Sequence, residues 1–241
     1  ISKIPAKNRL ADFPHYLMHR AEQLDNLYIF KNTEGTPENI RKFHPNIIVS
    51  STGSAPLLPP IAGLKDRIDN ENHNIYSILG MISHINDFPK DLKGKKVVVV
   101  GGGAVGLDVV EFFADRNADI SIVEMMDQIG RDLDPVSKND TKIMMKKHNV
   151  HQLTKTALLE VKDSSFLVKG DGEPYELPFE YGFVCLGMRV QGQLYQNLTY
   201  EFSSEDVEIM NIGDSQRARR IIDGTQEGRN ILTILEQKGY L

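Results

Sequence analysis

The pattern of apolar and polar residues predicts strands and helices that alternate along the chain. Short apolar runs that end in glycine or beside it predict buried strands at 46–53, 181–187 and 207–214. Apolar residues at helical spacing predict helices at 11–26, 35–44, 134–150 and 219–237, with one more around 75–86. Residues 95–124 have the pattern of strand, helix and strand. Such alternation is typical of a parallel sheet with crossover connections.

The same pattern also predicts shorter elements and the roles of individual positions. The apolar residues LYIF at 27–30 predict a short strand, and alternation over 158–170 predicts an antiparallel hairpin. Asp12 is the expected N-cap of the first helix. In the closing helix, the spacing predicts that these residues point inward: Ile222, Thr225, Ile231, Leu232 and Leu235.

One glycine-rich stretch carries the chemistry, KKVVVVGGGAVGLDVVEFF at residues 95–113. Gly101, Gly103 and Gly106 form the pattern G-x-G-x-x-G. The first glycine permits the tight turn out of the strand, the second lets a diphosphate approach the backbone, and the third lets the helix pack closely. The stretch therefore resembles the start of a dinucleotide-binding unit.

The surroundings of this fingerprint strengthen the prediction. Ala104 and Val105 open the helix, whose free N–H groups and positive dipole end favour a phosphate. The next strand, ADISIVE, ends on Glu124, 21 residues after Gly103. An acidic residue at that place accepts hydrogen bonds from the adenosine ribose hydroxyls.

Glu124 favours NAD(H) over NADP(H), because a carboxylate repels a 2′-phosphate and no arginine follows it immediately. Two alternatives stay open at this point. The fingerprint could hold the adenosine half of FAD, since both cofactors share it. It could also be a glycine-rich turn that binds no ligand.

Composition narrows the class of protein. The chain has 241 residues and a net charge of −5, which argues against a nucleic-acid or anionic-membrane partner. No apolar run approaches the roughly 20 residues that a membrane span needs. The single cysteine, Cys185, excludes an internal disulfide or a multi-thiolate cluster within these residues. We expect a cytoplasmic protein without a signal peptide, with no metal site.

Four segments, in order, resemble one family. They are IIVSSTGSAPLLPPIAG, the stretch from KKVVVVGGG to GRDLDP, CLGMRVQGQLY, and VEIMNIGDSQRARRIIDGTQEG. The sequence is similar to the pyridine nucleotide–disulfide oxidoreductase-like flavoproteins. Within them it is most similar to the C-terminal FAD- and NAD(P)-binding portion of the old-yellow-enzyme-type NADH:flavin oxidoreductases, which include 2,4-dienoyl-CoA reductase and 2-enoate reductases.

The resemblance implies an α/β fold with an insertion. A Rossmann-like, three-layer NAD-binding lobe, with a parallel sheet and a short antiparallel β-meander, would be inserted in a partial FAD-binding lobe. Residues 1–62 and 193–241 would form the two pieces of the FAD lobe, 63–94 a crossing segment, and 95–192 the NAD(H)-binding lobe. The fingerprint would then lie mid-chain because its lobe is the insertion.

The resemblance also implies which residues meet FAD. Asp214 would accept a hydrogen bond from the flavin ribityl chain, and Gly213 would keep the strand end open beside it. Thr52 and Gly53 would lie against the cofactor, and Gly187 near the nicotinamide. No residue of the chain is expected to act as a general acid or nucleophile.

By resemblance, the intact protein would be an NADH-dependent flavoprotein oxidoreductase that accepts hydride onto FAD and passes electrons to a module reducing activated C=C bonds or similar acceptors. The first residue is Ile rather than Met, so we expect a fragment that is inactive alone. An iron–sulfur cluster and FMN would lie in upstream domains of the same polypeptide. A nucleotide-binding structural module and a disulfide reductase remain the alternatives. We also expect the intact protein to act on a small-molecule substrate.

Overall fold

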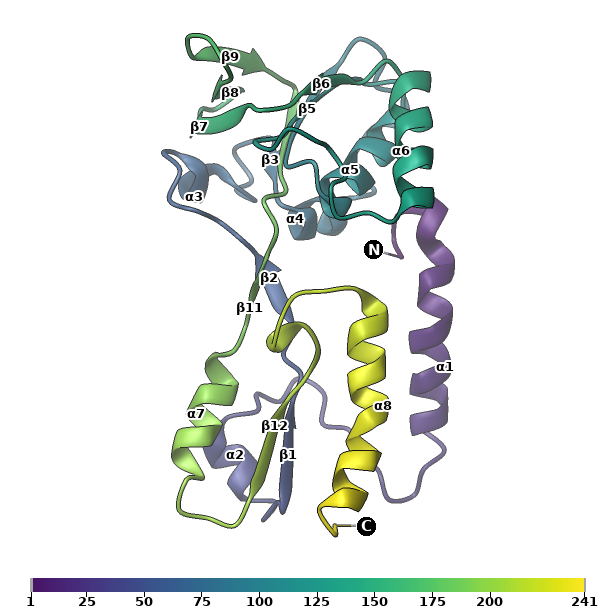
Figure 1. The fold of residues 1–241 in the computed structure, drawn as a ribbon, viewed down its shortest axis with the longest axis vertical. Coiled ribbons are helices and arrows are strands. Elements are labelled where there is room, and N and C mark those ends of the chain that lie inside the picture. The colour runs from purple at the N-terminus through teal and green to yellow at the C-terminus, as the bar shows by residue number, and fades with distance from the viewer. Residues whose placement is uncertain (1, 241) are drawn as a thin grey trace. The chain divides into compact units, whose positions relative to one another are not determined.

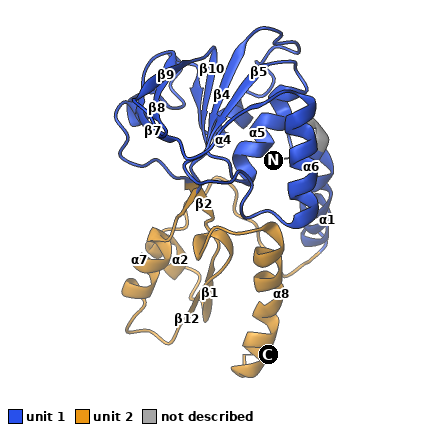
Figure 2. Cartoon of the chain, turned by 45° about the horizontal axis from the view of Figure 1, so that its top comes forward, with its two compact units in different colours: residues 1–23, 56–187 blue, residues 24–55, 188–241 orange. Residues whose placement is uncertain are grey.

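The computed structural model describes residues 2–240 and has an α/β architecture, as predicted (Figure 1). The chain forms two compact units, and each unit is built from two separate segments (Figure 2). Unit 1 comprises residues 1–23 and 56–187, and unit 2 comprises residues 24–55 and 188–241. Residues 1–23 and the predicted crossing segment thus belong to the unit that contains the fingerprint. None of the described helices is long and apolar enough to cross a bilayer.

Unit 1 is organised around a five-stranded parallel sheet with the strand order β3-β10-β4-β5-β6. Its strands are β3 (Ile75–Tyr76), β10 (Tyr181–Val184), β4 (Lys96–Val100), β5 (Asp119–Val123) and β6 (His151–Leu153). An antiparallel sheet of β7 (Ala157–Val161), β8 (Ser165–Lys169) and β9 (Tyr175–Pro178) follows β6 and contains the predicted hairpin. The helical elements are η1 (Pro5–Ala11), α1 (Asp12–Ala21), α3 (Leu64–Arg67), α4 (Ile78–Ser83), α5 (Ala104–Ala114) and α6 (Pro135–Lys147).

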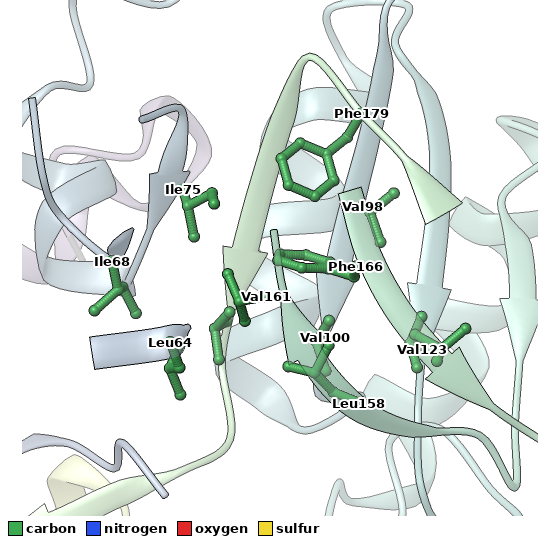
Figure 3. Close-up of a cluster of buried hydrophobic side chains, with 12 residues drawn as sticks. Leu64, Ile68, Ile75, Val98, Val100, Val123, Leu158, Val161, Phe166 and Phe179 are labelled. Carbon is green, nitrogen blue, oxygen red and sulfur yellow. The ribbon is translucent and has the colours of Figure 1, made fainter. Parts of the chain in front are cut away.

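The strand β4 is apolar on both faces because both are covered. Val98 and Val100 pack with side chains of the antiparallel sheet, among them the fully buried Phe166 (Figure 3). Val99 faces α5, and the ring of Phe113 in that helix lies 4.8 Å from the ring of Phe183 in β10. Helix, parallel sheet and antiparallel sheet therefore form the three layers that the resemblance predicted.

Unit 2 contains a two-stranded parallel sheet, in which β1 (Ile47–Ser50) pairs with β12 (Glu208–Asn211). Ile48, Leu198 and Phe202 form its small buried core. Its helical elements are α2 (Pro37–Arg41), α7 (Gln193–Glu201), η2 (Gly213–Ser215) and α8 (Ile221–Gln237). The strands β2 (Ser54–Pro56) and β11 (Met188–Val190) pair where the chain passes between the units.

Three local predictions are wrong. Residues 27–30 form no strand, because a strand needs a hydrogen-bonded partner and no described segment pairs with them. Asp12 is not an N-cap, since η1 runs directly into α1 and puts Asp12 at the first helical position. The helix around 75–86 is shorter than predicted, because β3 takes up its start and Ser77 Oγ caps α4 by accepting from the Gly80 N–H.

The inward face predicted for the closing helix is also wrong in most positions. Within α8, Ile222 and Leu232 are 57% and 62% exposed, and Thr225 is exposed too. Of the five predicted residues, only Ile231 and Leu235 are half-buried. An amphipathic helix buries its apolar stripe only where a neighbouring layer covers it, and the sheet of β1 and β12 in unit 2 has two strands.

Truncation of the core tests the three-layer packing of unit 1. Phe166→Ala should lower the free energy of unfolding by about 3–5 kcal/mol, because it leaves a ring-sized cavity between the two sheets. Leu159→Ala in the same antiparallel sheet, where the side chain is exposed, is the matched control and should cost about 1 kcal/mol or less. Urea unfolding measures both, and equal losses would contradict the packing described.

Candidate functional site

The fingerprint turn joins β4 to α5 and is held by two very close backbone approaches. Gly101 has φ +108°, and a Cβ atom there would lie 2.1 Å from the carbonyl oxygen of Cys185, which follows β10. A Cβ atom on Gly106 would lie 1.9 Å from the carbonyl oxygen of Gly101. Neither position has room for a side chain. The helix therefore packs on the sheet at a distance that only glycine permits, as the fingerprint predicts.

Gly103 differs from its neighbours because the space beside it is open. It is the N-cap of α5 with φ −78° and ψ 179°, and a Cβ atom there would meet nothing within 4 Å. No side chain caps the helix, so the backbone N–H groups of its first turn are left for a ligand. Ala104 and Val105, in that turn, line a pocket. This open N-terminus has the shape and the donors that fit a diphosphate.

The carboxylate of Glu124 lies against the fingerprint turn. Its Oε2 accepts a hydrogen bond from the Gly102 N–H at 2.6 Å, and its Oε1 accepts one from the Met126 N–H at 2.7 Å. A carboxylate offers about four lone-pair sites, so two remain for further donors. The backbone N–H groups therefore fix the orientation of Glu124 while leaving it able to accept hydrogen bonds from ribose hydroxyls.

A pocket of about 610 Å³ in unit 1 includes the fingerprint turn, Glu124 and Gly187. Most of its wall is apolar, contributed by Leu57, Pro59, Ile61, Val100, Val123, Leu158 and Leu186. Gly187 has φ +108°, and the space beside it is open. Every residue that lines this pocket comes from one unit, so unit 1 alone supplies the site.

Cys185 lines this pocket but is buried, and its burial raises the pKa of the thiol to about 12. At neutral pH the thiol is protonated and is a poor nucleophile. Cys185 therefore packs as a small apolar side chain.

A second pocket, of about 310 Å³, adjoins the fingerprint turn. Its lining includes Gly103, Glu124 and Asp132, which also line the larger pocket, together with Arg131. The two pockets thus share three residues. Sequence reasoning missed Arg131 and Asp132. Their signal was two charged residues shortly after the acid that ends the strand.

Unit 2 brings together four further predicted residues where β1 and β12 end. The Thr52 hydroxyl donates to the Gln191 carbonyl at 2.7 Å, and Gly53 has φ +77° with open space beside it. Asp214 accepts from the Ser54 hydroxyl and from the Arg219 N–H, both at 3.1 Å.

The N–H group of Gly213 is also already bonded. It donates to Glu227 Oε2 at 2.6 Å, and Glu227 forms an ion pair with Arg219. The Gly213 hydrogen bond and the Arg219 guanidinium together lower the pKa of Glu227. The space beside Gly213 is open, so the backbone that follows β12 is accessible to a ligand.

Two glycine substitutions test which position of the turn is too crowded for a side chain and which is open. Gly101→Ala should lower the free energy of unfolding by more than about 3 kcal/mol, because the methyl group meets the Cys185 carbonyl and the backbone is left-handed. Gly103→Ala should change it by about 1 kcal/mol or less, since nothing lies beside that Cβ. Urea unfolding distinguishes them, and a Gly101→Ala variant as stable as the Gly103→Ala variant would contradict the close approach.

Comparison with known proteins identifies the family of this chain. The family described as pyridine nucleotide-disulphide oxidoreductase matches residues 20–211. A metal reductase of Desulforamulus reducens is 27% identical over 91% of this chain and 36% of its own length. An NADH oxidase of Thermoanaerobacter brockii is 26% identical over 79% of this chain and 28% of its own length. The chain thus spans about a third of the length of these curated relatives.

The fold has solved counterparts as well. A structure of 2-naphthoyl-CoA reductase with 2-naphthoyl-CoA superposes with a TM-score of 0.76 at 21% identity, covering 94% of this chain and 32% of that one. At this level of identity the likeness concerns the fold. The match extends over both units, because it covers nearly the whole chain.

Proposed function

Because the chain belongs to the pyridine nucleotide-disulphide oxidoreductase family, we propose that unit 1 binds NADH and that unit 2 contributes part of an FAD site. When bound, these cofactors would supply hydride transfer from NADH to FAD. The observation that carries the proposal is the Glu124 carboxylate, held 2.6 Å from the Gly102 nitrogen beside an open pocket. A ligand that needs both ribose recognition and diphosphate binding fits this pair of features.

Different residues of unit 1 would bind different parts of the nucleotide. The free N–H groups at Gly103, Ala104 and Val105 would bind the diphosphate, and Glu124 would accept from the adenosine ribose. The apolar wall of the pocket would exclude water from a bound nucleotide, and the open space beside Gly187 would leave room for the nicotinamide ring.

Residues of unit 2 would contact the flavin cofactor. Asp214 is held by Ser54 and Arg219 with one hydrogen bond on each oxygen, which leaves acceptor capacity for a ribityl hydroxyl. Open space beside Gly53 and Gly213 would let a cofactor approach the backbone there. Thr52 would support this wall through its bond to Gln191.

We propose further that this portion passes electrons to another module of a longer protein. The support is twofold. The curated relatives are about three times as long as the chain, and its four segments resemble those of the NADH:flavin oxidoreductases that reduce activated C=C bonds. The one cysteine of this chain is buried and its pKa is raised to about 12, so a disulfide reductase would need redox thiols from outside these residues. A structural nucleotide-binding module is the remaining alternative.

Nucleotide titration of the 241-residue chain tests the proposal. We expect NADH to bind more tightly than NADPH, because Glu124 repels a 2′-phosphate. Glu124→Ala should weaken NADH binding by about tenfold, the loss of roughly 1.4 kcal/mol of ribose hydrogen bonding, and should reduce the preference for NADH. Calorimetry or NADH fluorescence measures both effects.

The matched control is Glu173→Ala, an exposed glutamate that lines neither pocket, and it should bind NADH like the wild type. A Glu124→Ala variant with unchanged NADH affinity would remove the basis of the proposal. ADP that binds as tightly as NADH, with no contribution from the nicotinamide half, would favour the structural module instead.

A further inference from the structure

A separate pocket of about 310 Å³ lies at the edge of the parallel sheet where the strands begin. The first residues of three neighbouring strands line it: Lys96 of β4, Asp119 of β5 and His151 of β6. Parallel strands begin at one edge of a sheet and end at the other, and β4 ends at the fingerprint turn. The pocket is therefore distinct from the nucleotide site, and it shares no lining residue with either pocket of that turn.

The charged residues of this pocket lie on the sheet face that the antiparallel sheet covers. Val98 of β4 and Val123 of β5 belong to the buried core between the two sheets. Side chains alternate along a strand, so Lys96 and Asp119 lie on that same face. A covered face of a parallel sheet is ordinarily apolar, yet these two residues are charged and exposed. The two sheets therefore leave an opening at this edge.

The pocket presents a cation and an anion next to each other. Lys96 and Asp119 are direct partners in the register of β4 and β5. They form no ion pair with each other within residues 2–240, and Asp119 Oδ1 instead lies 3.7 Å from Nε2 of His151. Both charges thus line the pocket without neutralising each other.

Apolar side chains form most of the remaining wall. Val98, which is 2% exposed, and the half-buried Leu153 come from the parallel sheet, while Leu177 and Pro178 come from β9 of the antiparallel sheet. The ring of Tyr175, at the start of β9, is also part of the lining. Small-molecule sites measure roughly 300–1,000 Å³, so this volume suits a small ligand.

From this arrangement we infer that the pocket binds a small zwitterion with an apolar side chain, of the class of the hydrophobic α-amino acids. The ligand carboxylate pairs with Lys96, its ammonium group pairs with Asp119, and its side chain packs on the apolar wall. A ligand with only a carboxylate is repelled by Asp119, and one with only an ammonium group is repelled by Lys96. The inference does not depend on the proposed function, because the two sites share no residue.

Three probes of similar size separate the contributions of the two charges. L-Phenylalanine carries both, 3-phenylpropanoate carries only the carboxylate, and phenethylamine carries only the ammonium group. Titration of the 241-residue chain, followed by the amide signals in NMR spectra, measures their affinities. L-Phenylalanine should bind about fivefold more tightly than either analogue, because it makes one more charge pair. The amide signals of Lys96, Asp119 and His151 should shift.

Two variants assign each charge to its partner. Lys96→Met and Asp119→Asn should each weaken L-phenylalanine binding by about fivefold. Lys96→Met should not weaken phenethylamine, and Asp119→Asn should not weaken 3-phenylpropanoate. The matched controls are Lys169→Met and Asp171→Asn, which change exposed residues outside this pocket and should leave all affinities unchanged.

Two kinds of result would overturn the inference. One is L-phenylalanine that shifts no amide signal of this pocket, or that binds both charge variants like the wild type. The other is a single-charge analogue that binds as tightly as L-phenylalanine. Neither result affects the proposed function, since Lys96→Met and Asp119→Asn should bind NADH like the wild type and the Glu124→Ala titration tests that site separately.

Discussion

The site depends on the close approach of two parallel strands where they end. Strand β4 leads into Gly101 and β10 leads into Cys185, and the carbonyl of Cys185 lies where a side chain of Gly101 would be. This contact forces glycine at 101 and a left-handed backbone there, which turns the chain sharply into α5. The N-terminus of α5 consequently opens at the edge of the sheet, where Glu124 also ends a strand.

The electrostatics of the site follow from this geometry. Parallel strands end at one edge of the sheet, so the acid after β5 and the amides of the turn after β4 become neighbours. The segment after β5 then folds back onto the turn through the Gly130–Gly102 hydrogen bond. The acidic Glu124 and the basic Arg131 therefore line the same pocket, although several residues separate them along the chain.

Unit 2 shows the opposite situation, in which apolar residues lack a covering layer. A parallel sheet of two strands offers little surface for an amphipathic helix, and parallel sheets are ordinarily buried on both faces. Residues 27–30 and the stripe on α8 are therefore exposed among the described residues. Unit 1 completes its three layers from its own segments, and every residue that lines its larger pocket belongs to unit 1.

The order of residues alone predicts the α/β alternation, the fingerprint with its three glycines, and the acid at the end of the next strand of that unit. These features are local: spacing, turn chemistry and strand length are written in neighbouring residues. Within the described residues, the tertiary fold leaves residues 27–30 without a strand partner and the apolar stripe of α8 exposed, because pairing and burial require surfaces contributed by distant segments. The tertiary fold also places Arg131 beside the turn. The backbone hydrogen bond between Gly130 and Gly102 that brings the two segments together cannot be predicted from residue types.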